Sequence, residues 1–343
     1  MEKESTSRRE LWTKSTIHKL FRIDATQRTI VNAEERGEIP KAERVPYGER
    51  LSARKWRLDQ LPEIGTRFGF LKHPKHRHVI CVYTAKGGVL KTTFTFNLAR
   101  ALALNGIRTA IVGLDSQCSV TDHILGTREI QTLDQFEPVP GLFHLIKDHI
   151  NPSEIIKKTD LPTLDIVPET VELIALESHI RERTKREEVL QNELLPHLEN
   201  YSVIIFDTPP SWNLLIMNAL TASNHLISPI GCDLGSFQAL TTNLSTVTDF
   251  GKAMDLDWDT FVLLPTLLAS TKLSTQILHA YIQKYTGKVT AASIRRAVKG
   301  EESLALRESV FEYDPTSPLA EDYYSAVGEI WGQIIESEKR RGD

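Results

Sequence analysis

The sequence of 343 residues has little cysteine and no long apolar segment, and both absences narrow the class of protein. Its three cysteines, Cys81, Cys118 and Cys232, are far apart and odd in number, which fits neither a disulfide framework nor a zinc site. No apolar run approaches the roughly 18 residues of a membrane span, and the charged start MEKESTSRRE has no signal-peptide core. With 41% hydrophobic and 25% charged residues, we expect a globular protein of the reducing cytoplasm.

The net charge of −4 conceals two regions of opposite sign. Residues 1–78 contain 18 lysines and arginines against 11 aspartates and glutamates, a balance of +7. The remainder contains 23 against 34, a balance of −11. A basic N-terminal region on an acidic body predicts that the N-terminal region contacts a polyanion. A solvated basic surface without a partner is the alternative.

From residue 78 onward the pattern predicts an α/β domain with a mostly parallel sheet covered by helices on both faces. Helical spacing over 92–105 follows a short apolar run, and similar runs recur along the chain. Ligands of such sheets bind at the carboxyl ends of the strands. Asp115 and Asp207 each close a run, so we expect them in one crevice with a glycine-containing loop. The expected strands are 79–84, 107–115, 201–207, 224–231 and 260–268.

The glycine-containing loop, TAKGGVLKTT (84–93), lies between a predicted strand and a predicted helix, as a phosphate loop does. The ordinary pattern is G-x-x-x-x-G-K-S/T, but Ala85 and Leu90 stand where that pattern has glycine. The loop also carries two lysines, Lys86 and Lys91, where the pattern needs one. The sequence therefore predicts a P-loop NTPase fold with an unusual phosphate loop.

The residue types of this loop suit a nucleoside triphosphate with Mg²⁺. Gly87 and Gly88 let successive backbone N–H groups approach phosphate oxygens. Lys91 opens the helix, whose N-terminus adds the positive end of its dipole. Thr92 offers a hydroxyl to Mg²⁺, and Asp207 offers a carboxylate at the end of a neighbouring strand. The predicted nucleotide contacts in the loop are Lys86, Gly87, Gly88, Val89, Leu90, Lys91, Thr92 and Thr93.

Four stretches together resemble the deviant Walker ATPases of the ParA/MinD family, over roughly residues 78–338. The resemblance implies an ATP-dependent sandwich homodimer in which Lys86 reaches the phosphates of the partner subunit. It also implies that Asp115 orients the attacking water and that Asp207 is the Walker B acid. The stretches are KGGVLKTT, IVGLDSQCSVTDHILG, VIIFDTPPSWNLLIMNALTAS and SVFEYDPTSPLAEDYYSAVGEI.

The same resemblance assigns further roles and shows two departures. Leu90 replaces a glycine that most relatives carry, and LDSQ replaces the more usual DPQ while keeping Asp115. Pro265 and Thr266 match a segment beside the adenine. The implied catalytic residues are Lys86, Lys91 and Asp115, and the implied Mg²⁺ site is Thr92, Asp115 and Asp207.

Within the family, DNA segregation is favoured over two other activities. A reductase with a bridging iron–sulfur cluster would need cysteine motifs that Cys118 and Cys232 lack. Membrane-placing relatives end in a basic amphipathic helix, whereas residues 318–343 mix acids with an apolar stripe that predicts packing on the body. The segments 270–289 and 292–310 resemble the DNA-contacting segments of partition ATPases. The stripe is Tyr323, Ile330, Trp331 and Ile334, and the candidate contacts to the DNA backbone are Lys272, Arg295, Arg296 and Lys299.

Residues 1–62 are predicted to form a winged helix-turn-helix domain. STIHKLF predicts a short helix and RIDA a turn; DATQRTIVNAEERG then predicts a second helix with Asp24 and Gln27 as a capping box and Gly37 as its stop. PYG (46–48) predicts the tip of a basic hairpin. The pattern resembles MerR-like winged domains, and a small helical cap that binds no DNA is the alternative. The candidate DNA contacts are Gln27, Arg28, Arg54 and Lys55.

The segment between the two domains, 63–77, is predicted to be a basic linker, with the ATPase domain spanning 78–343. His73, His76 and His78 have no accompanying carboxylate or cysteine, so a linker is favoured over a metal site.

The sequence as a whole predicts a nucleoid-associated partition ATPase. Its expected partners are a second copy of the chain, DNA and a ParB-like centromere-binding protein that stimulates hydrolysis, with no membrane. The N-terminal domain would add operator binding and autorepression. A nucleotide-switched transcriptional regulator without a role in segregation is the alternative.

Overall fold

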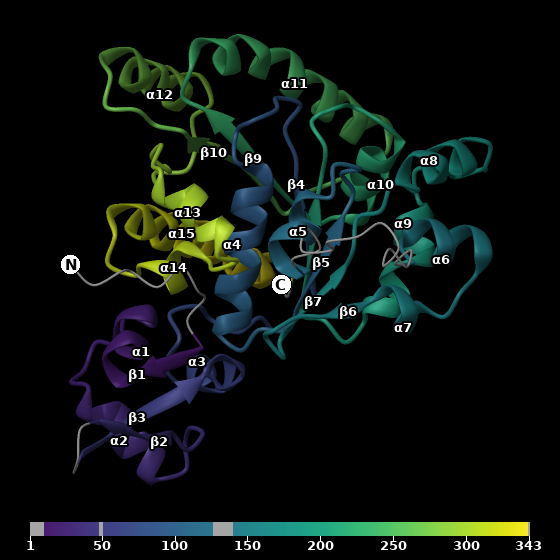
Figure 1. The fold of residues 1–343 in the computed structure, drawn as a ribbon. Helices are drawn as coiled ribbons and strands as arrows, with labels where there is room; N and C mark the ends of the chain where they lie inside the picture. The colour runs from purple at the N-terminus through teal and green to yellow at the C-terminus, as the bar shows by residue number, and fades with distance from the viewer. Residues whose placement is uncertain (1–9, 48–50, 126–139, 342–343) are drawn as a thin grey trace.

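The protein is described by a computed structural model that covers residues 10–47, 51–125 and 140–341. Its centre is a seven-stranded sheet with the order β10-β9-β4-β8-β5-β7-β6, parallel except for the last pair (Figure 1). This confirms the predicted α/β class. The strands are β4 (His78–Val82), β5 (Thr109–Gly113), β6 (Lys157–Lys158), β7 (Leu164–Val167), β8 (Val203–Asp207), β9 (His225–Gly231) and β10 (Thr260–Thr266).

Helices cover both faces of the sheet because its strands bury alternate side chains on opposite sides. Ile80 and Val82 pack with α4 and α15, while Val79 and Cys81 pack with the helices of the other face. Helix α4 therefore lies against the strand that precedes it. The first face is covered by α4 (Lys91–Leu104), α5 (Ser119–Leu125), α14 (Val310–Tyr313) and α15 (Pro318–Arg341). The second is covered by α6 (Leu142–Asp148), α8 (Leu173–Arg181), α9 (Val189–Glu193), α10 (Leu214–Ala222) and α11 (Leu234–Ala253).

The five predicted strands form, each within two residues of an expected end, but β6 and β7 were missed. Strand β7 spans only four residues, and Asp165 interrupts its apolar pattern. That carboxylate is buried, accepts a hydrogen bond from the Tyr201 hydroxyl at 2.6 Å and pairs with Lys158 at 2.7 Å. The buried strand was therefore not predicted, because the charged Asp165 that it contains is stabilised by partners elsewhere in the chain. The remaining helices are α7 (Pro152–Ile155), α12 (Lys272–Lys284) and α13 (Lys299–Ala305).

The described part of the N-terminal module, residues 10–47 and 51–60, contains a three-stranded antiparallel sheet, two short α-helices and a short 3-10 helix (Leu58–Gln60). Gly37 ends α2 at φ +70°, and the Glu38 N–H reaches the Ala33 carbonyl, as expected. The predicted capping box is wrong: α2 starts at Arg28 after Gln27, without a side-chain cap, and the turn that leads into it is closed by the Thr29 N–H, which donates to the Thr26 carbonyl at 2.9 Å. The elements are β1 (Leu11–Thr13), α1 (Lys14–Leu20), α2 (Arg28–Glu35), β2 (Glu43–Tyr47) and β3 (Leu51–Arg57). Of the predicted hairpin tip, Pro46 and Tyr47 belong to β2, and Gly48 lies outside the described residues.

Residues 63–68 of the predicted linker instead belong to a helix, α3 (Leu61–Phe68), which packs on the C-terminal end of α4. A Cβ at Gly65 would lie 1.8 Å from the Leu104 carbonyl oxygen, so the two backbones touch. Beyond α3, the Leu71 N–H donates to the Asn105 side chain at 3.1 Å. The linker was predicted from the basic composition of the segment. That composition does not reveal that Leu61 and Ile64 form a buried apolar face.

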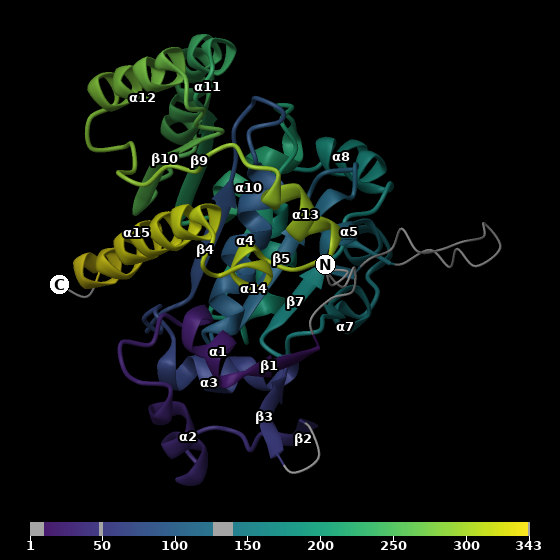
Figure 2. The same cartoon turned by 60° about the vertical axis from the view of Figure 1, so that its left-hand side comes forward.

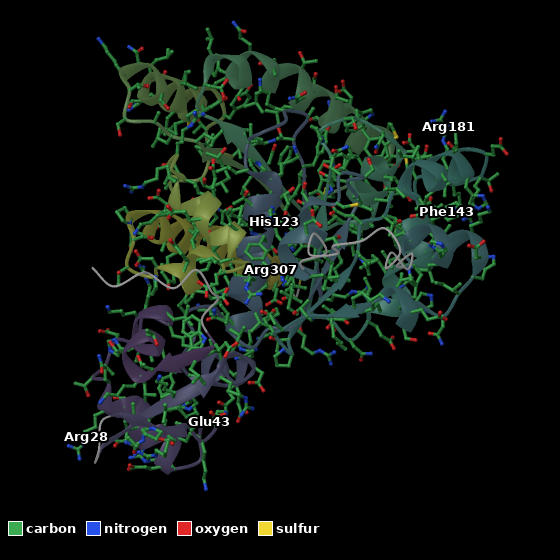
Figure 3. The ribbon with its side chains drawn as sticks, in the orientation of Figure 1. Arg28, Glu43, His123, Phe143, Arg181 and Arg307 are labelled. Atoms are coloured by element: carbon green, nitrogen blue, oxygen red, sulfur yellow. The ribbon has the colours of Figure 1, made fainter. Side chains whose placement is uncertain are left out.

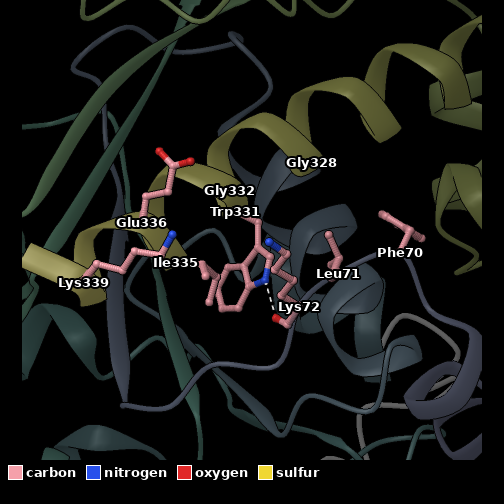
Figure 4. A pocket seen from close by; sticks show the side chains of 9 residues that line it. All are labelled: Phe70, Leu71, Lys72, Gly328, Trp331, Gly332, Ile335, Glu336 and Lys339. Atoms are coloured by element: carbon pink, nitrogen blue, oxygen red, sulfur yellow. Dashed lines mark hydrogen bonds between the residues drawn. The ribbon is translucent and has the colours of Figure 1, made fainter.

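Helix α15 lies between the N-terminal module and the pair formed by α11 and α12 (Figure 2). The Tyr324 hydroxyl donates to the Leu20 carbonyl at 2.7 Å, and the Trp331 indole N–H donates to the Lys72 carbonyl at 2.8 Å (Figure 4). The predicted apolar stripe is confirmed, since Tyr323, Ile330, Trp331 and Ile334 are all buried. Across the described ranges, no helix is both long and apolar enough to cross a membrane.

Candidate nucleotide site

The loop between β4 and α4 forms a cradle at the carboxyl edge of the sheet. Gly88 has φ +71°, and a Cβ there would meet nothing within 4 Å; a Cβ at Gly87 would touch only Pro210, at 4.0 Å. Both glycines are exposed. Leu90 has φ 65° and ψ 28°, the left-handed conformation, immediately before the helix begins. The backbone therefore takes the shape that favours glycine at this position, and a leucine occupies it.

Lys91, Thr92 and Asp207 converge beneath this loop. Lys91 is only 7% exposed, and its ammonium donates to the Lys86 carbonyl at 3.0 Å, so its side chain runs back over its own loop. The Thr92 and Thr95 hydroxyls both donate to Asp207 at 2.8 Å. Burial raises the pKa of Asp207 to about 6, against the opposing effect of these hydrogen bonds. Burial likewise lowers the pKa of Lys91.

Asp115 lies at the end of the neighbouring strand, beside Asp207 and half-buried. Strand β5 pairs with β8 in register Gly113↔Asp207, and the Leu114 N–H donates to the Asp207 carbonyl at 2.9 Å. The Asp115 carboxylate accepts from the Gln117 N–H at 3.0 Å. The structure therefore brings together the two acids that the sequence placed in one crevice.

The two lysines of the loop point in different directions. In contrast to Lys91, Lys86 extends toward the start of α11, where a Cβ at Gly235 would lie 3.3 Å from its Nζ. The pKa of Asp233 is lowered overall. Burial acts to raise this pKa, but hydrogen bonds from Ser236 and the charge of Lys86 outweigh that effect. Lys86 thus lies beside the start of α11, whereas Lys91 lies against its own loop.

The remaining predicted nucleotide contacts lie around the same loop. Val89 is buried, and Thr93 is half-buried on α4. The Thr266 hydroxyl donates to the Val89 carbonyl at 3.1 Å, and the Pro265 carbonyl accepts from the Ile294 N–H at 2.9 Å. Thr266 therefore supports the loop from β10, and a contact of Pro265 and Thr266 with adenine stays a prediction.

The groups present fit a nucleoside triphosphate with Mg²⁺. The open space above Gly87 and Gly88 gives phosphates access to backbone N–H groups at a helix N-terminus. The hydroxyl of Thr92 and the carboxylate of Asp207 are hard oxygen donors that already lie 2.8 Å apart. Thr92 and Asp207 would hold Mg²⁺, which would supply neutralisation of phosphate charge, and Lys91 would hold the phosphates.

Comparisons with known proteins agree with this geometry. A family model described as an AAA domain matches residues 77–258. The sporulation initiation inhibitor protein Soj of Bacillus subtilis is 31% identical over 253 residues, covering 74% of this chain and 97% of Soj. The chain belongs to the ParA/MinD family of ATPases.

Two further relatives of this ParA/MinD-family chain are informative. The chromosome partitioning protein ParA of Myxococcus xanthus is 28% identical, covering 77% of this chain and 91% of that protein. The cobyrinic acid a,c-diamide synthase of Mycobacterium smegmatis, solved with bound ADP and magnesium, is 28% identical with a TM-score of 0.55, over 67% of this chain and 91% of that one. The fold around the cradle is therefore one that holds a nucleotide and magnesium in another protein.

The sequence reasoning missed Glu169, a third carboxylate at the same edge. It follows β7, which pairs with β5 and so places Glu169 next to the Asp115 strand. Its side chain is 4% exposed, and burial, with the charge of Asp207, raises its pKa well above the ordinary value. The signal that could have found it is the acid in VPET after an apolar run, but β7 itself was not predicted.

Two of the predicted DNA contacts lie at the start of α2. Arg28 is exposed at the outer end of the N-terminal module (Figure 3), and Gln27 precedes it. Lys55 is half-buried. Arg54 is engaged inside the module: it donates to Glu34 at 2.6 Å and to Glu35 at 3.0 Å, and Glu34 is buried. Arg54 therefore ties β3 to α2, because its guanidinium neutralises two carboxylates.

The four predicted DNA contacts of the ATPase body divide into two pairs. Lys272 and Arg296 are exposed. Arg295 donates to Asp322 at 2.6 and 2.8 Å, and Lys299 donates to Asp314 at 2.6 Å. The charges of Arg295 and Lys299 are thus largely compensated by acids that follow later in the sequence, which the local basic pattern did not indicate.

Proposed function

We propose that this chain is a partition ATPase that binds Mg²⁺ and ATP, forms a nucleotide-sandwich homodimer and binds DNA. The observation that carries the proposal is that the two lysines of one phosphate loop extend in different directions. Lys91 is buried beneath its own loop, whereas Lys86 extends toward α11. An ordinary phosphate loop requires only the first of these.

The two lysines would bind the phosphates of different subunits. Lys91 would bind the β- and γ-phosphates of its own subunit, at a helix N-terminus that already favours anions. Lys86 would reach the phosphates of the partner subunit, where it would stabilise transition-state charge as an arginine finger does. Asp115, beside Asp207, would orient the attacking water. ATP hydrolysis would then depend on dimerisation.

Exposed apolar side chains support a second copy as the occupant of this edge. Among the described residues, several large apolar side chains more than half exposed lie shortly after the carboxyl ends of β7, β9 and β10, around the cradle. A sandwich dimer would bury them and exclude water from the phosphates. They are Val171, Ile174, Leu234 and Leu273.

DNA binding by the body is supported by a basic groove between α11 and α12, lined by Lys252, Lys284 and Lys288 together with hydroxyl side chains and one acid, Asp249. The Lys284 ammonium also donates to a threonine hydroxyl, and Lys288 lies over the Phe261 ring. Lysines in such a setting suit backbone phosphates without base readout. Lys272 lies at the start of α12 and would extend this surface.

The N-terminal module would add site-specific DNA binding, because Arg28 projects from the start of α2 at the end of the molecule far from the seven-stranded sheet (Figure 3). A hairpin, β2 and β3, follows α2 in the order that a wing requires. We propose that this mode binds an operator and that a centromere-binding protein stimulates hydrolysis in the nucleoid-bound dimer.

The central test compares Lys91→Ala with Lys86→Ala. We expect Lys91→Ala to weaken ATP affinity in calorimetry by about 10- to 150-fold, because phosphate charge loses a charge-assisted partner. Lys86→Ala should bind ATP like the wild type but form no ATP-dependent dimer in light scattering. Normal dimers and normal turnover in Lys86→Ala would return the site to an ordinary phosphate loop.

A turnover assay separates segregation from regulation alone. ATPase rates are measured with random DNA, with and without the product of the neighbouring gene. Stimulation by that product together with DNA supports the partition ATPase. Operator binding with negligible turnover in every mixture would favour a nucleotide-switched transcriptional regulator.

DNA binding is tested by salt dependence. The double variant Lys284→Ala/Lys288→Ala should reduce the slope of log affinity against log salt by about 0.9 per lysine on random DNA. Lys147→Ala, an exposed lysine on α6, is the control. Arg28→Ala should cost about 1–3 kcal/mol at an operator and little on random DNA. An equal loss on both DNAs would make Arg28 a phosphate contact instead.

A further inference from the structure

Glu169 holds the loop that follows Asp115 through hydrogen bonds from two successive backbone N–H groups. Its Oε2 accepts from the Val120 N–H at 3.1 Å and from the Thr121 N–H at 3.2 Å. In return, the Glu169 N–H donates to the Thr121 hydroxyl at 2.8 Å. These contacts join the end of β7 to the start of α5, across 48 or more positions of sequence.

The side chain lies across β5 to make these contacts. A Cβ at Gly113 would lie 2.1 Å from Cγ of Glu169 and 3.2 Å from its Oε1, so only glycine leaves room there. Gly113 is paired with Asp207 and stands two positions before Asp115. Glu169 therefore packs directly over the strand end that carries the proposed catalytic acid.

Residues 115–118 form a tight turn between this anchor and the crevice. The Cys118 N–H donates to the Asp115 carbonyl at 2.9 Å, and Cys118 has φ 55°. The Cys118 thiol also points to the Glu169 carbonyl at 3.5 Å. With β5 on one side and Glu169 on the other, both ends of the turn are fixed, and the Asp115 carboxylate between them has a defined position.

We propose that Glu169 is a positioning residue for ATP hydrolysis, which fixes the 115–121 loop so that Asp115 faces the transferred phosphoryl group. The inference rests on the proposed function of this site. Glu169 acts through backbone groups, because its carboxylate accepts hydrogen bonds from the Val120 and Thr121 N–H groups. Its contribution is geometric: a loose loop would misplace Asp115 without changing the phosphate cradle.

The experiment uses the full-length protein with Glu169→Ala, Glu169→Gln and, as a control, Glu182→Ala, an exposed glutamate at the end of α8. Hydrogen exchange is measured without nucleotide. In Glu169→Ala we expect the Val120 and Thr121 amides to exchange at least tenfold faster. Glutamine keeps an acceptor oxygen, so Glu169→Gln should restore most of the protection. Unchanged exchange in Glu169→Ala overturns the anchor.

Kinetics then separate positioning from general damage. Glu169→Ala should lower the stimulated kcat about tenfold or more, with ATP affinity within about twofold of the wild type, because Lys91 and the glycine loop are unchanged. Glu169→Gln should recover kcat. Faster exchange with a normal kcat would overturn the positioning role, as would a parallel loss of kcat and ATP affinity. If the wild type itself hydrolyses no ATP under any condition, the proposed function fails, while the exchange result still decides whether Glu169 anchors the loop.

Discussion

The contact between α3 and α4 predicts opposite effects for the same substitution at two glycines. Gly65, in α3, would place a Cβ 1.8 Å from the Leu104 carbonyl oxygen, and real Cβ atoms essentially never come within 3.0 Å of another group. The helices must therefore separate by about 1 Å, which typically costs about 1–3 kcal/mol as overpacking. The gain from replacing glycine in a helix is about 0.5–1 kcal/mol. Gly65→Ala should thus lose up to about 2.5 kcal/mol of unfolding free energy, roughly 1 kcal/mol at the middle of both ranges.

Gly328 on α15 is the matched control, since a Cβ there meets nothing within 4 Å. Gly328→Ala should gain about 0.5–1 kcal/mol. Urea unfolding followed by circular dichroism measures both, and trypsin cleavage after Arg67 and Lys72 reports whether α3 has detached. We expect faster cleavage only in Gly65→Ala. Equal stabilisation by the two substitutions would show that α3 does not pack on α4 in solution, and the rigid link between the N-terminal module and the phosphate-loop helix would be refuted.

Four further substitutions, at three positions, test the packing around α4. Glu312→Gln should cost about 3–5 kcal/mol in urea unfolding, because Arg100, 1% exposed, would keep its charge while losing the buried negative charge of its partner. Asp160→Asn, at the more exposed end of the same arginine, should cost about 1 kcal/mol or less. A larger loss at Asp160 would reverse this assignment. Leu90→Gly should change the free energy of unfolding by less than about 1 kcal/mol, because relief of the left-handed strain offsets the lost packing and the added backbone freedom of the unfolded chain. Leu90→Val should lose about 1–3 kcal/mol, because a β-branched residue is strained at φ 65°. Equal stability of the two Leu90 variants in the same assay would contradict the left-handed conformation.

The local parts of this protein could be predicted from the sequence alone. Strand, glycine loop and helix follow one another within 27 residues, 78–104, and each has its own local signal: a β-rich run, a glycine pair, then helical spacing. Asp115 and Asp207 could be placed because parallel strands end at one edge, whatever their order. The burial of the C-terminal stripe followed from its spacing in the same way. Each of these features depends on neighbours in sequence or on a general property of parallel sheets.

Tertiary structure decided what each charged side chain does, because pairing depends on which distant segments meet. Arg54, Arg295 and Lys299 are predicted DNA contacts, and the structure pairs each of them with an acid 15 to 27 positions away in the sequence. Glu169 reaches the Asp115 loop only because β7 lies next to β5. The docking of α3 required the backbone of Gly65 to meet the end of α4. No local pattern records strand order or helix contacts, since these arise from burying apolar faces and pairing charges across the whole chain.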